Sequence, residues 1–268
     1  MTELLDQPGG EKLLAQTKQT SAIRSMFDRI SPTYDLLNHL LSFNVDRYWR
    51  RVTAEVVVAH QPERVLDVCC GTGDLALALR RAAMRKGLNL KCIATDFAPA
   101  MVCRAAQKFA ATDQSAAGSL KAAIADTLQL PFRDNTFDAV TVAFGIRNVA
   151  DLDAGLRELA RVVRPGGMVA ILEFSQPRSR VFAPLYRFYS FRVMPWVGKL
   201  ISGTRAYAYL PASVDAFPSG EEFLKRLHAA CHGVVCLREL TFGIATLYCG
   251  TVAKPGASSD AQPATGGA

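Results

Sequence analysis

The sequence predicts an α/β fold with a doubly wound, mostly parallel Rossmann-like sheet, and three observations support this prediction. Short apolar runs typical of buried parallel strands alternate with helical patterns over residues 65–173. The first run ends in a glycine turn that leads directly into a helix. Residues 241–244 join the last two apolar runs as a short hairpin, which indicates an antiparallel last strand. Repeated strand–helix units imply right-handed crossovers within one sheet.

The N-terminal part is predicted to form a helical cap. Residues 1–20 are polar without a sustained period, so we expect a flexible N-terminus. Apolar residues then recur at helical spacing, a second helix follows Pro32 over residues 34–41, and a third covers residues 45–58. Because these helices precede the first strand, we expect residues 21–60 to lie over its ligand edge.

The central part is predicted to alternate between strands and helices. The expected strands cover residues 65–68, 91–95, 121–125, 137–143 and 168–173. The expected helices cover residues 74–80, 99–109 and 152–162. In such sheets ligands bind at the carboxyl ends of the strands, so Asp67, Asp96, Asp126 and Ala143 are expected at one edge.

The C-terminal part begins with residues 178–211, a basic, aromatic-rich segment that interrupts the alternation and is predicted to be a lid. The expected elements that follow are one helix and two strands, over residues 221–230, 234–240 and 245–252. The tail over residues 254–268 is rich in Pro, Gly, Ser and Ala and is expected to be flexible. The folded domain should therefore span residues 21–253.

Composition limits the class of protein. With 268 residues, half of them apolar, the chain can bury the core of one main domain. Its formal charge of +7 favours anionic surroundings, either nucleic acid or an anionic membrane surface. Seven cysteines without metal-ligand spacing are typical of a reducing compartment. No apolar run approaches the length of a membrane span, and no signal-peptide core is present, so a cytoplasmic protein is expected.

The turn Gly71-Thr72-Gly73 is the predicted cofactor site, because its glycines allow a ligand close to the backbone and the next helix presents free N–H groups. The pattern G-x-G-x-x-A also fits a dinucleotide, so an NAD-dependent oxidoreductase is the alternative. However, Asp67 and Asp74 would face the pyrophosphate as two anions against a third. S-adenosylmethionine carries a sulfonium and an ammonium and no phosphate, so it is the predicted cofactor.

Two further strand ends carry carboxylates. Asp96 is placed to accept both hydroxyls of an adenosine ribose, or else to cap the helix over residues 99–109. Asp126, with Thr127, is placed to bind the amino edge of adenine, although a simple turn aspartate is the alternative. Both positions extend the predicted cofactor site along the sheet edge.

Three motifs carry a family resemblance. They are Tyr34-Asp35-Leu36-Leu37-Asn38 with Ser42 and Trp49-Arg50, then Phe144-Gly145-Ile146-Arg147-Asn148, and Arg161-Val162-Val163-Arg164-Pro165-Gly166-Gly167 with Glu173-Phe174-Ser175. On these motifs the chain resembles the ubiquinone/menaquinone biosynthesis C-methyltransferase family, within the class I S-adenosylmethionine-dependent methyltransferases. Its closing segment looks most like demethylmenaquinone methyltransferases. Asp46 stands where many members have His, so a proton-transfer role of that histidine does not carry over.

The resemblance implies methyl transfer from S-adenosylmethionine to a ring carbon of demethylmenaquinol, giving menaquinol in the last step of menaquinone biosynthesis. A prenylated benzoquinol of ubiquinone biosynthesis is the alternative substrate. The chemistry calls for no metal and no covalent intermediate. From a different class, a non-catalytic membrane-associated scaffold is the remaining alternative.

The resemblance places a catalytic arginine at Arg147, where a guanidinium would stabilise the substrate phenolate. The alternative is an ion pair that holds the following helix. Tyr34 and Asn38 lie one helical turn apart and are expected to reach from the cap onto the quinol oxygens, although Tyr34 would equally suit a core aromatic.

Residues 178–211 interleave arginines with aromatic side chains, which suits an anionic membrane surface that delivers the prenylated naphthoquinol. Stacking on RNA and a lid with a solvated basic face are the alternatives. We expect no nucleic-acid partner and a protein that works peripherally at the inner face of the membrane. The oligomeric state is left open between a monomer and a homodimer.

Overall fold

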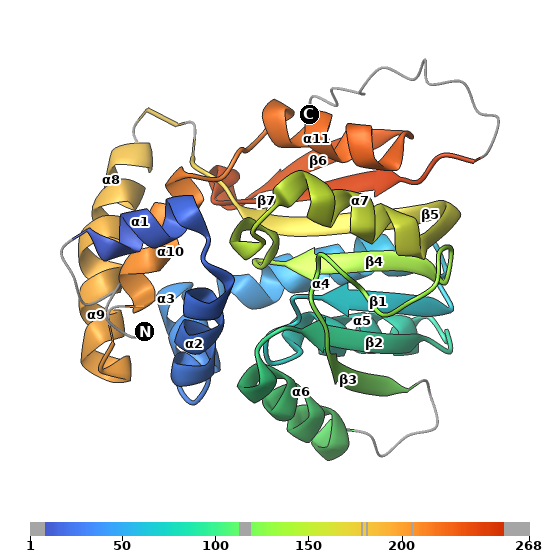
Figure 1. The fold of residues 1–268 in the computed structure, drawn as a ribbon, viewed down its shortest axis with the longest axis horizontal. Coiled ribbons are helices and arrows are strands. Elements are labelled where there is room, and N and C mark those ends of the chain that lie inside the picture. The colour runs from blue at the N-terminus through green and yellow to red at the C-terminus, as the bar shows by residue number, and fades with distance from the viewer. Residues whose placement is uncertain (1–8, 113–118, 178, 181, 205, 255–268) are drawn as a thin grey trace.

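The computed structural model describes residues 9–112, 119–177, 179–180, 182–204 and 206–254 (Figure 1). Apart from Lys254, the predicted flexible tail over residues 254–268 lies outside these described residues. Two groups of elements are visible: a sheet covered by helices on both faces, and a separate group of helices at one end of that sheet.

The sheet has seven strands in the order β3-β2-β1-β4-β5-β7-β6. The strands are β1 (Arg64–Val68), β2 (Lys91–Asp96), β3 (Leu120–Ile124), β4 (Phe137–Ala143), β5 (Val163–Phe174), β6 (Val235–Leu240) and β7 (Ala245–Thr251). β1 to β5 pair in parallel, whereas β7 is antiparallel to both β5 and β6. The predicted fold class, with its antiparallel last strand, is therefore confirmed. β5 begins at Val163 and not at the predicted residue 168. Val163 pairs with Phe137 of β4, and after a bulge the pairing continues from Met168 with Ala139.

Helices cover both faces of the sheet, and the central parallel strands β1, β4 and β5 are buried on both sides for most of their length. Along β1, Val65 packs in the core of one face and Leu66 in the core of the other, as alternating side chains of a strand must. The first face carries α4 (Val45–Ala59), α5 (Asp74–Arg85) and α6 (Pro99–Thr112). The second carries α7 (Leu152–Val162) and α11 (Glu221–Cys231).

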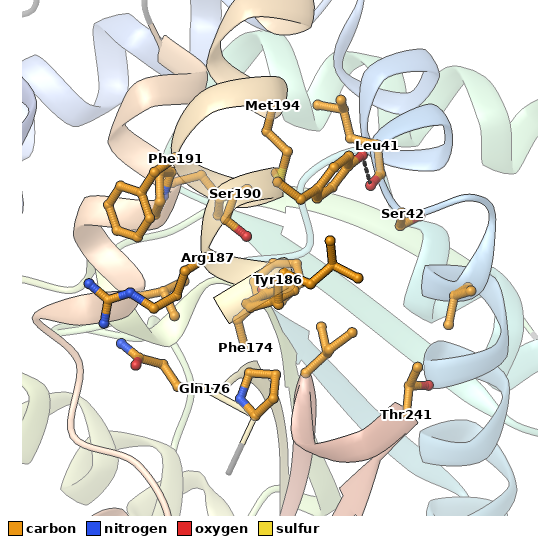
Figure 2. A pocket seen from close by; sticks show the side chains of 18 of the residues that line it. Leu41, Ser42, Phe174, Gln176, Tyr186, Arg187, Ser190, Phe191, Met194 and Thr241 are labelled. Carbon is orange, nitrogen blue, oxygen red and sulfur yellow. Dashed lines mark hydrogen bonds between the residues drawn. The ribbon is translucent and has the colours of Figure 1, made fainter. Parts of the chain in front are cut away.

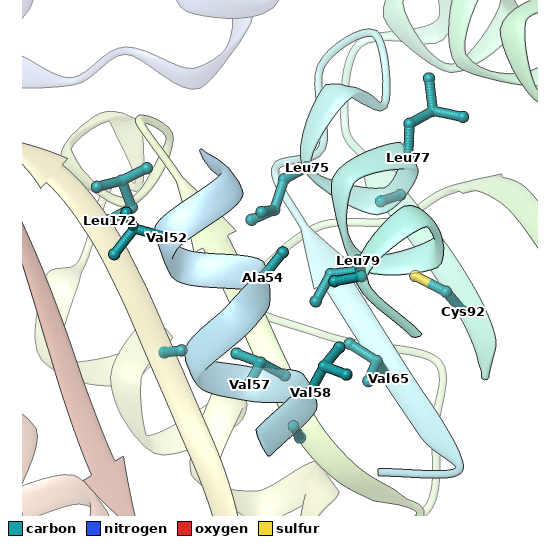
Figure 3. Packing of buried hydrophobic residues seen from close by; sticks show 14 of the residues in the cluster. Val52, Ala54, Val57, Val58, Val65, Leu75, Leu77, Leu79, Cys92 and Leu172 are labelled. Carbon is teal, nitrogen blue, oxygen red and sulfur yellow. The ribbon is translucent and has the colours of Figure 1, made fainter. Parts of the chain in front are cut away.

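Helix α4 differs from its predicted place in the cap. Figure 3 shows α4 lying between β5, which carries Leu172, and α5, which carries Leu75 and Leu79. Val57 and Val58 of α4 are fully buried in this core. The segment is therefore a layer helix of the sheet and not one of the cap helices.

The cap lies beyond the carboxyl ends of the parallel strands (Figure 1). It consists of α1 (Gly10–Thr17), α2 (Thr20–Ile30), α3 (Tyr34–Leu41), α8 (Phe182–Phe188), the π-helical turn η2 (Tyr189–Val193), α9 (Met194–Ser202) and α10 (Ala206–Asp215). The predicted lid is thus helical and packs with the N-terminal helices, since Leu37 and Leu41 share a buried cluster with Met194 and Tyr207.

Helix α1 lies within the stretch that was expected to be a flexible N-terminus. Its Leu14 and Ala15 are buried in one cluster with Ala206 and Tyr209 of α10. The structure differs from the expectation over Gly10–Thr17 because the apolar partner of this short helix comes from the distant lid.

The π turn η2 ends two residues before Pro195, in the helical run over residues 182–202. Proline has no N–H to donate, and in a regular α-helix its ring clashes with the carbonyl four residues earlier. A single π turn accommodates both constraints without ending the helix. The run from α8 to α9 is therefore helical throughout.

Candidate active site

The turn between β1 and α5 is held in shape by its glycines and by Asp96. Gly71 and Gly73 have φ of +53° and +86°, in the left-handed region. A Cβ on Gly73 would lie 2.6 Å from the Phe109 ring of α6. The Gly71 N–H donates to Asp96 Oδ2 over 2.9 Å. The turn that was predicted from sequence is thus tied to the ends of β2 and α6.

Asp67 is a fully buried carboxyl group at the end of β1. Its Oδ1 accepts a hydrogen bond of 2.8 Å from the Thr141 hydroxyl, whereas the buried Oδ2 makes no well-formed hydrogen bond with the described residues. Burial raises the pKa of Asp67 to about 7. Asp67 lines a small cavity together with Gly71 and Cys70, so its bare oxygen is suited to a cationic ligand group.

Asp96 makes the helix-capping contact considered from the sequence, and its ribose-binding role stays a prediction. Its Oδ1 accepts from the Ala98 N–H at the start of α6, while its other oxygen holds Gly71. Burial raises its pKa to about 6. Asp96 also lines a cavity together with Asp126 and Thr127, so the structure brings these three predicted residues together.

Asp126 and Thr127 differ in their surroundings. The exposed Asp126 accepts from the Leu128 N–H over 2.9 Å, as a turn aspartate does. Thr127 is buried, with its Oγ1 3.3 Å from the sulfur of Cys69. The cavity that they line holds about 50 Å³, whereas ligand sites usually hold about 300–1,000 Å³. Phe27 and Tyr34 of the cap line it too, so a nucleoside ligand requires them to move outwards.

Thr72 and Asp74 turn towards a lysine of α6. Lys108 Nζ lies 2.8 Å from Asp74 Oδ1, 2.6 Å from Asp35 Oδ2 and 2.9 Å from the Thr72 hydroxyl. Burial acts to raise the pKa of Asp74, but Arg50 and Lys108 outweigh it, and the pKa is lowered overall. Thr72, expected to bind cofactor, therefore has its side chain engaged within the protein.

A second cavity adjoins the 50 Å³ cavity that Asp96 lines, and it lies under the cap. It is lined by Met26, Phe27, Ile30, Tyr34, Asn38, Ser42, Asp46, Arg50, Phe144, Arg147, Phe174, Ala206, Tyr207, Tyr209 and Leu210. Tyr34 lines both cavities. Its ring also lies close to the turn, since a Cβ on Gly71 would be 3.5 Å from it. Burial raises the pKa of Tyr34, and a hydrogen bond links it to Asn38. The predicted pair Tyr34 and Asn38 therefore meets Arg147 in one cavity.

Arg147, only 6% exposed, is held by several partners. Its Nη1 lies 2.7 Å from Glu173 Oε1 and also donates to the Phe144 carbonyl, while its Nε donates to the Ser213 hydroxyl over 3.1 Å. Among the described residues, Nη2 makes no hydrogen bond. The ion pair considered from sequence does exist, but it joins Arg147 to the end of β5 and not to the next helix.

His39 is a site residue that sequence reasoning missed, whereas Arg50 and Glu173 stood in the quoted motifs without an assigned role. Asp46 Oδ2 lies 2.8 Å from His39 Nδ1 and also accepts from Arg50 Nη1, while Oδ1 accepts from the Ser42 hydroxyl over 2.7 Å. The departure at Asp46 was the available signal, because an unusual buried carboxylate must find partners. Their identity depends on how α3 and α4 meet.

A larger, apolar cavity of about 480 Å³ continues from the second one. The two share Asn38, Ser42, Phe174 and Leu210. Figure 2 shows Phe174, Tyr186 and Met194 around this space, and the dashed line marks the Tyr189 hydroxyl donating to the Leu41 carbonyl. The two cavities together could hold a long ligand. Its polar end would lie beside Arg147, and its apolar part would run outwards between α3 and the α8–α9 run.

The outer side of the α8–α9 run carries large exposed apolar side chains. Leu185, Phe188, Trp196 and Leu200 are 64%, 62%, 68% and 72% exposed. Exposed cations, namely Arg187, Arg192 and Lys199, stand among them. We call these seven residues the amphipathic stripe. Within the described part of the chain, every helix is too short or too polar to cross a membrane.

Comparison of the sequence with known proteins gives a consistent result. The model of the ubiE/COQ5 methyltransferase family matches residues 14–252. The ubiquinone/menaquinone biosynthesis C-methyltransferase UbiE of Geobacter sulfurreducens is 46% identical over 234 residues, which cover 87% of this chain and 90% of that protein. A demethylmenaquinone methyltransferase of Thermus thermophilus is 46% identical over 226 residues, 84% of this chain and 99% of that one. Its namesake in Deinococcus radiodurans is 44% identical over 230 residues, 85% and 92% of the two chains.

Solved structures resemble this one in fold. An O-methyltransferase family protein from Burkholderia thailandensis aligns with a TM-score of 0.59 at 15% identity, over 88% of this chain and 64% of that chain. A putative methyltransferase solved with the Haloferax volcanii Trm112 activator aligns with a TM-score of 0.56 at 19% identity, over 85% and 100% of the two chains. At these identities the likeness concerns the sheet and its helices alone.

Proposed function

The chain belongs to the ubiE/COQ5 methyltransferase family, and we propose that it transfers the methyl group of S-adenosylmethionine to a ring carbon of demethylmenaquinol, giving menaquinol. It is an S-adenosylmethionine-dependent C-methyltransferase of quinone biosynthesis. Relatives named demethylmenaquinone methyltransferase, at 44% and 46% identity, support the naphthoquinol. The double name of the Geobacter relative supports a prenylated benzoquinol as second candidate. Family membership argues against the NAD-dependent oxidoreductase and the scaffold.

The observation that carries the proposal is the order of the cavities. The glycine turn and Asp96 lie on one side of Tyr34, and Arg147 lies on the other. The apolar cavity follows beyond Asn38 and Phe174. A methyl donor, a quinol ring and an isoprenoid tail need a cofactor site, a polar cavity and an apolar cavity in this spatial order.

The residues around the turn fit the cofactor. We assign the ribose hydroxyls to Asp96, the adenine edge to Asp126 and Thr127, and the backbone contacts to Gly71, Thr72 and Gly73. The bare Oδ2 of Asp67 fits the ammonium group, which would satisfy an otherwise unpaired buried acceptor. When bound, the cofactor supplies an electrophilic methyl carbon on a sulfonium. Displacement at that carbon needs no metal.

Arg147 has an electrostatic role in this mechanism. A ring carbon becomes a good nucleophile when the neighbouring phenol loses its proton. A guanidinium aimed at the oxygen stabilises the phenolate and so lowers the pKa of the phenol. Arg147 cannot itself accept the proton, because a guanidinium in a protein stays protonated. Glu173 holds the guanidinium in place, and Tyr34 with Asn38 would hold the quinol oxygens.

The apolar cavity and the amphipathic stripe complete the proposal. The cavity would take the first isoprene units of the tail, since its walls are mainly apolar. The stripe would lie at an anionic membrane surface, with apolar side chains in the headgroup region and cations on the phosphates. The enzyme would then work peripherally at the inner membrane face and receive its substrate there.

The test is incubation of the protein with radiolabelled S-adenosylmethionine and a panel of reduced naphthoquinols and benzoquinols, followed by mass spectrometry of labelled products. We expect label in methylated naphthoquinol. Label in benzoquinol alone would show that a benzoquinol, and not demethylmenaquinol, is the substrate. Label in neither class of quinol would contradict the proposal. Thermal shifts with S-adenosylhomocysteine and with NAD control for the cofactor. Light scattering on the same preparation decides between monomer and homodimer.

A further inference from the structure

Asp46, His39 and Asp74 connect the catalytic cavity with the surface beside the glycine turn. Asp46 is 3% exposed and lines the cavity that holds Arg147. His39 Nδ1 lies 2.8 Å from Asp46 Oδ2, and His39 Nε2 lies 3.7 Å from Asp74 Oδ2. The side chains of His39 and Asp74 are 18% and 23% exposed. An imidazole thus stands between a buried carboxylate and one that reaches solvent.

The proposed reaction must release one proton from a buried cavity in each turnover. The phenol O–H bond breaks and its electron pair stays on oxygen. The ring carbon then forms a bond with the methyl carbon as the carbon–sulfur bond breaks, and sulfur keeps that pair. The ring carbon loses its hydrogen as a proton and the ring regains its aromatic electrons. Protonation of the oxygen restores the quinol, so one of the two protons leaves the site.

We propose that Asp46 accepts the phenolic proton and that His39 passes one proton per turnover towards Asp74 and water. This inference rests on the proposed function. A carboxylate oxygen has two lone-pair sites, and Asp46 Oδ1 accepts only from Ser42 among the described residues, so one site remains for the phenol. While Asp46 is ionised, His39 Nδ1–H donates to its Oδ2. Once Asp46 carries the phenolic proton, exchange with water moves the imidazole proton to Nε2, Nδ1 takes the proton from Asp46, and Nε2 releases its own towards Asp74, which restores the Nδ1–H tautomer.

Charged groups from several elements set the environment of this relay. Arg50 of α4 binds Asp46, and Lys108 of α6 binds Asp74 and Asp35. Arg147 lies across the cavity beside Glu173. One ligand atom each of His39, Asp46 and Asp74 lies within 4.8 Å of the others, which is the spacing of a metal site as well. Because Arg50 and Lys108 already pair with the two carboxylates, they would repel a divalent cation at this position.

Two variants test the relay. Asp46→Asn keeps the shape but removes the proton acceptor, so kcat should fall by about 10²–10⁴-fold, while KM for the quinol and the Kd for S-adenosylhomocysteine stay within about threefold. His39→Ala should lower kcat about tenfold or more and should alter the pH profile of kcat. Added imidazole should restore part of the His39→Ala rate. His60→Gln, an exposed histidine at the end of α4, is the matched control and should behave as wild type.

The outcomes separate this proposal from its alternatives. An Asp46→Asn rate within threefold of wild type overturns Asp46 as acceptor. A slow His39→Ala variant with the wild-type pH profile and no response to imidazole shows a merely structural histidine. If Asp46→Asn does not fold, as judged by circular dichroism, the imidazole response of His39→Ala decides. If wild-type protein methylates only benzoquinols, the proposed substrate fails, and the same variants test the relay with that substrate.

Discussion

The glycine turn and the helical cap build their sites in different ways. At the turn, positive-φ glycines and backbone N–H groups bonded to Asp96 shape the backbone, and all of them lie within residues 64–98. In the cavity under the cap, Arg147, Glu173, Asp46 and Tyr34 come from separate elements that meet only in the folded chain. Single substitutions at the turn should therefore change cofactor affinity, and substitutions in this cavity should change turnover.

Arg147→Ala should have the largest effect and should separate the two regions. Loss of the phenolate-stabilising guanidinium should lower kcat on the order of 10³-fold, about 4 kcal/mol, with the Kd for S-adenosylhomocysteine changed less than about threefold. Steady-state kinetics and calorimetry measure the two quantities.

The control for Arg147→Ala addresses folding. The substitution leaves Glu173 buried without its partner, which destabilises the fold. The double variant Arg147→Ala/Glu173→Gln should therefore recover melting temperature but not turnover. Recovery of turnover in the double variant would show that Arg147 acts only through the fold.

Asp67→Asn should stabilise the cofactor-free protein. The pKa of Asp67 is about 7 in the folded chain against 3.8 in the unfolded one, so the unfolded state binds fewer protons between these values. Ionisation of Asp67 therefore destabilises the folded chain. This destabilisation is absent below about pH 4, grows as the pH rises, and is complete above about pH 7. At pH 8 the variant should gain about 4 kcal/mol, seen as a higher melting temperature, with little gain at pH 4. An equal gain at both pH values would contradict this cause.

Asp96→Asn should weaken cofactor binding by about 10–100-fold, because a hydrogen bond to a charged acceptor contributes about 1.5–3 kcal/mol. Titration calorimetry with S-adenosylhomocysteine measures it. Asp126→Asn is the matched substitution at the exposed wall and should lose less than about fivefold. A larger loss of affinity for Asp126→Asn than for Asp96→Asn would indicate that Asp126, and not Asp96, makes the stronger contact with the cofactor.

Lys199→Gln should have the smallest effect. One cation near an anionic surface contributes about 1 kcal/mol, so binding to phosphatidylserine vesicles should weaken about fivefold at low salt. Lys86→Gln, at the opposite end of α5 from the glycine turn, is the control. Equal losses in the two variants would indicate attraction by net charge alone, without the amphipathic stripe.

The sheet could be predicted from sequence because buried parallel strands read as continuous apolar runs, and β4 and α7 have the predicted bounds. The place of α4 could not, since an apolar stripe looks the same whether it faces a sheet or a cap. Helix α1 was missed because its few buried residues need α10, far along the chain. Local patterns determine elements, but distant contacts determine where helices pack.

The candidate site divides along the same line. The glycine turn was predictable because positive φ is a local property of glycine. Arg147 was found through a motif, but its partner Glu173 lies 26 residues later and at the end of another strand. Likewise, Thr72 carries the expected residue type, yet Lys108 and Asp35 determine where its hydroxyl points. No local pattern encodes such pairings.

The π turn η2 sets the rotational phase of the amphipathic stripe. In an unbroken α-helix, Trp196 and Leu200 would stand about 80° and 120° around the axis from Phe188, at about 100° per residue. The surplus residue taken up by the π turn rotates α9 back by about 100°, which brings all three side chains within about 20° of one line. Deleting one residue within η2 would divide that line between two sides of the helix.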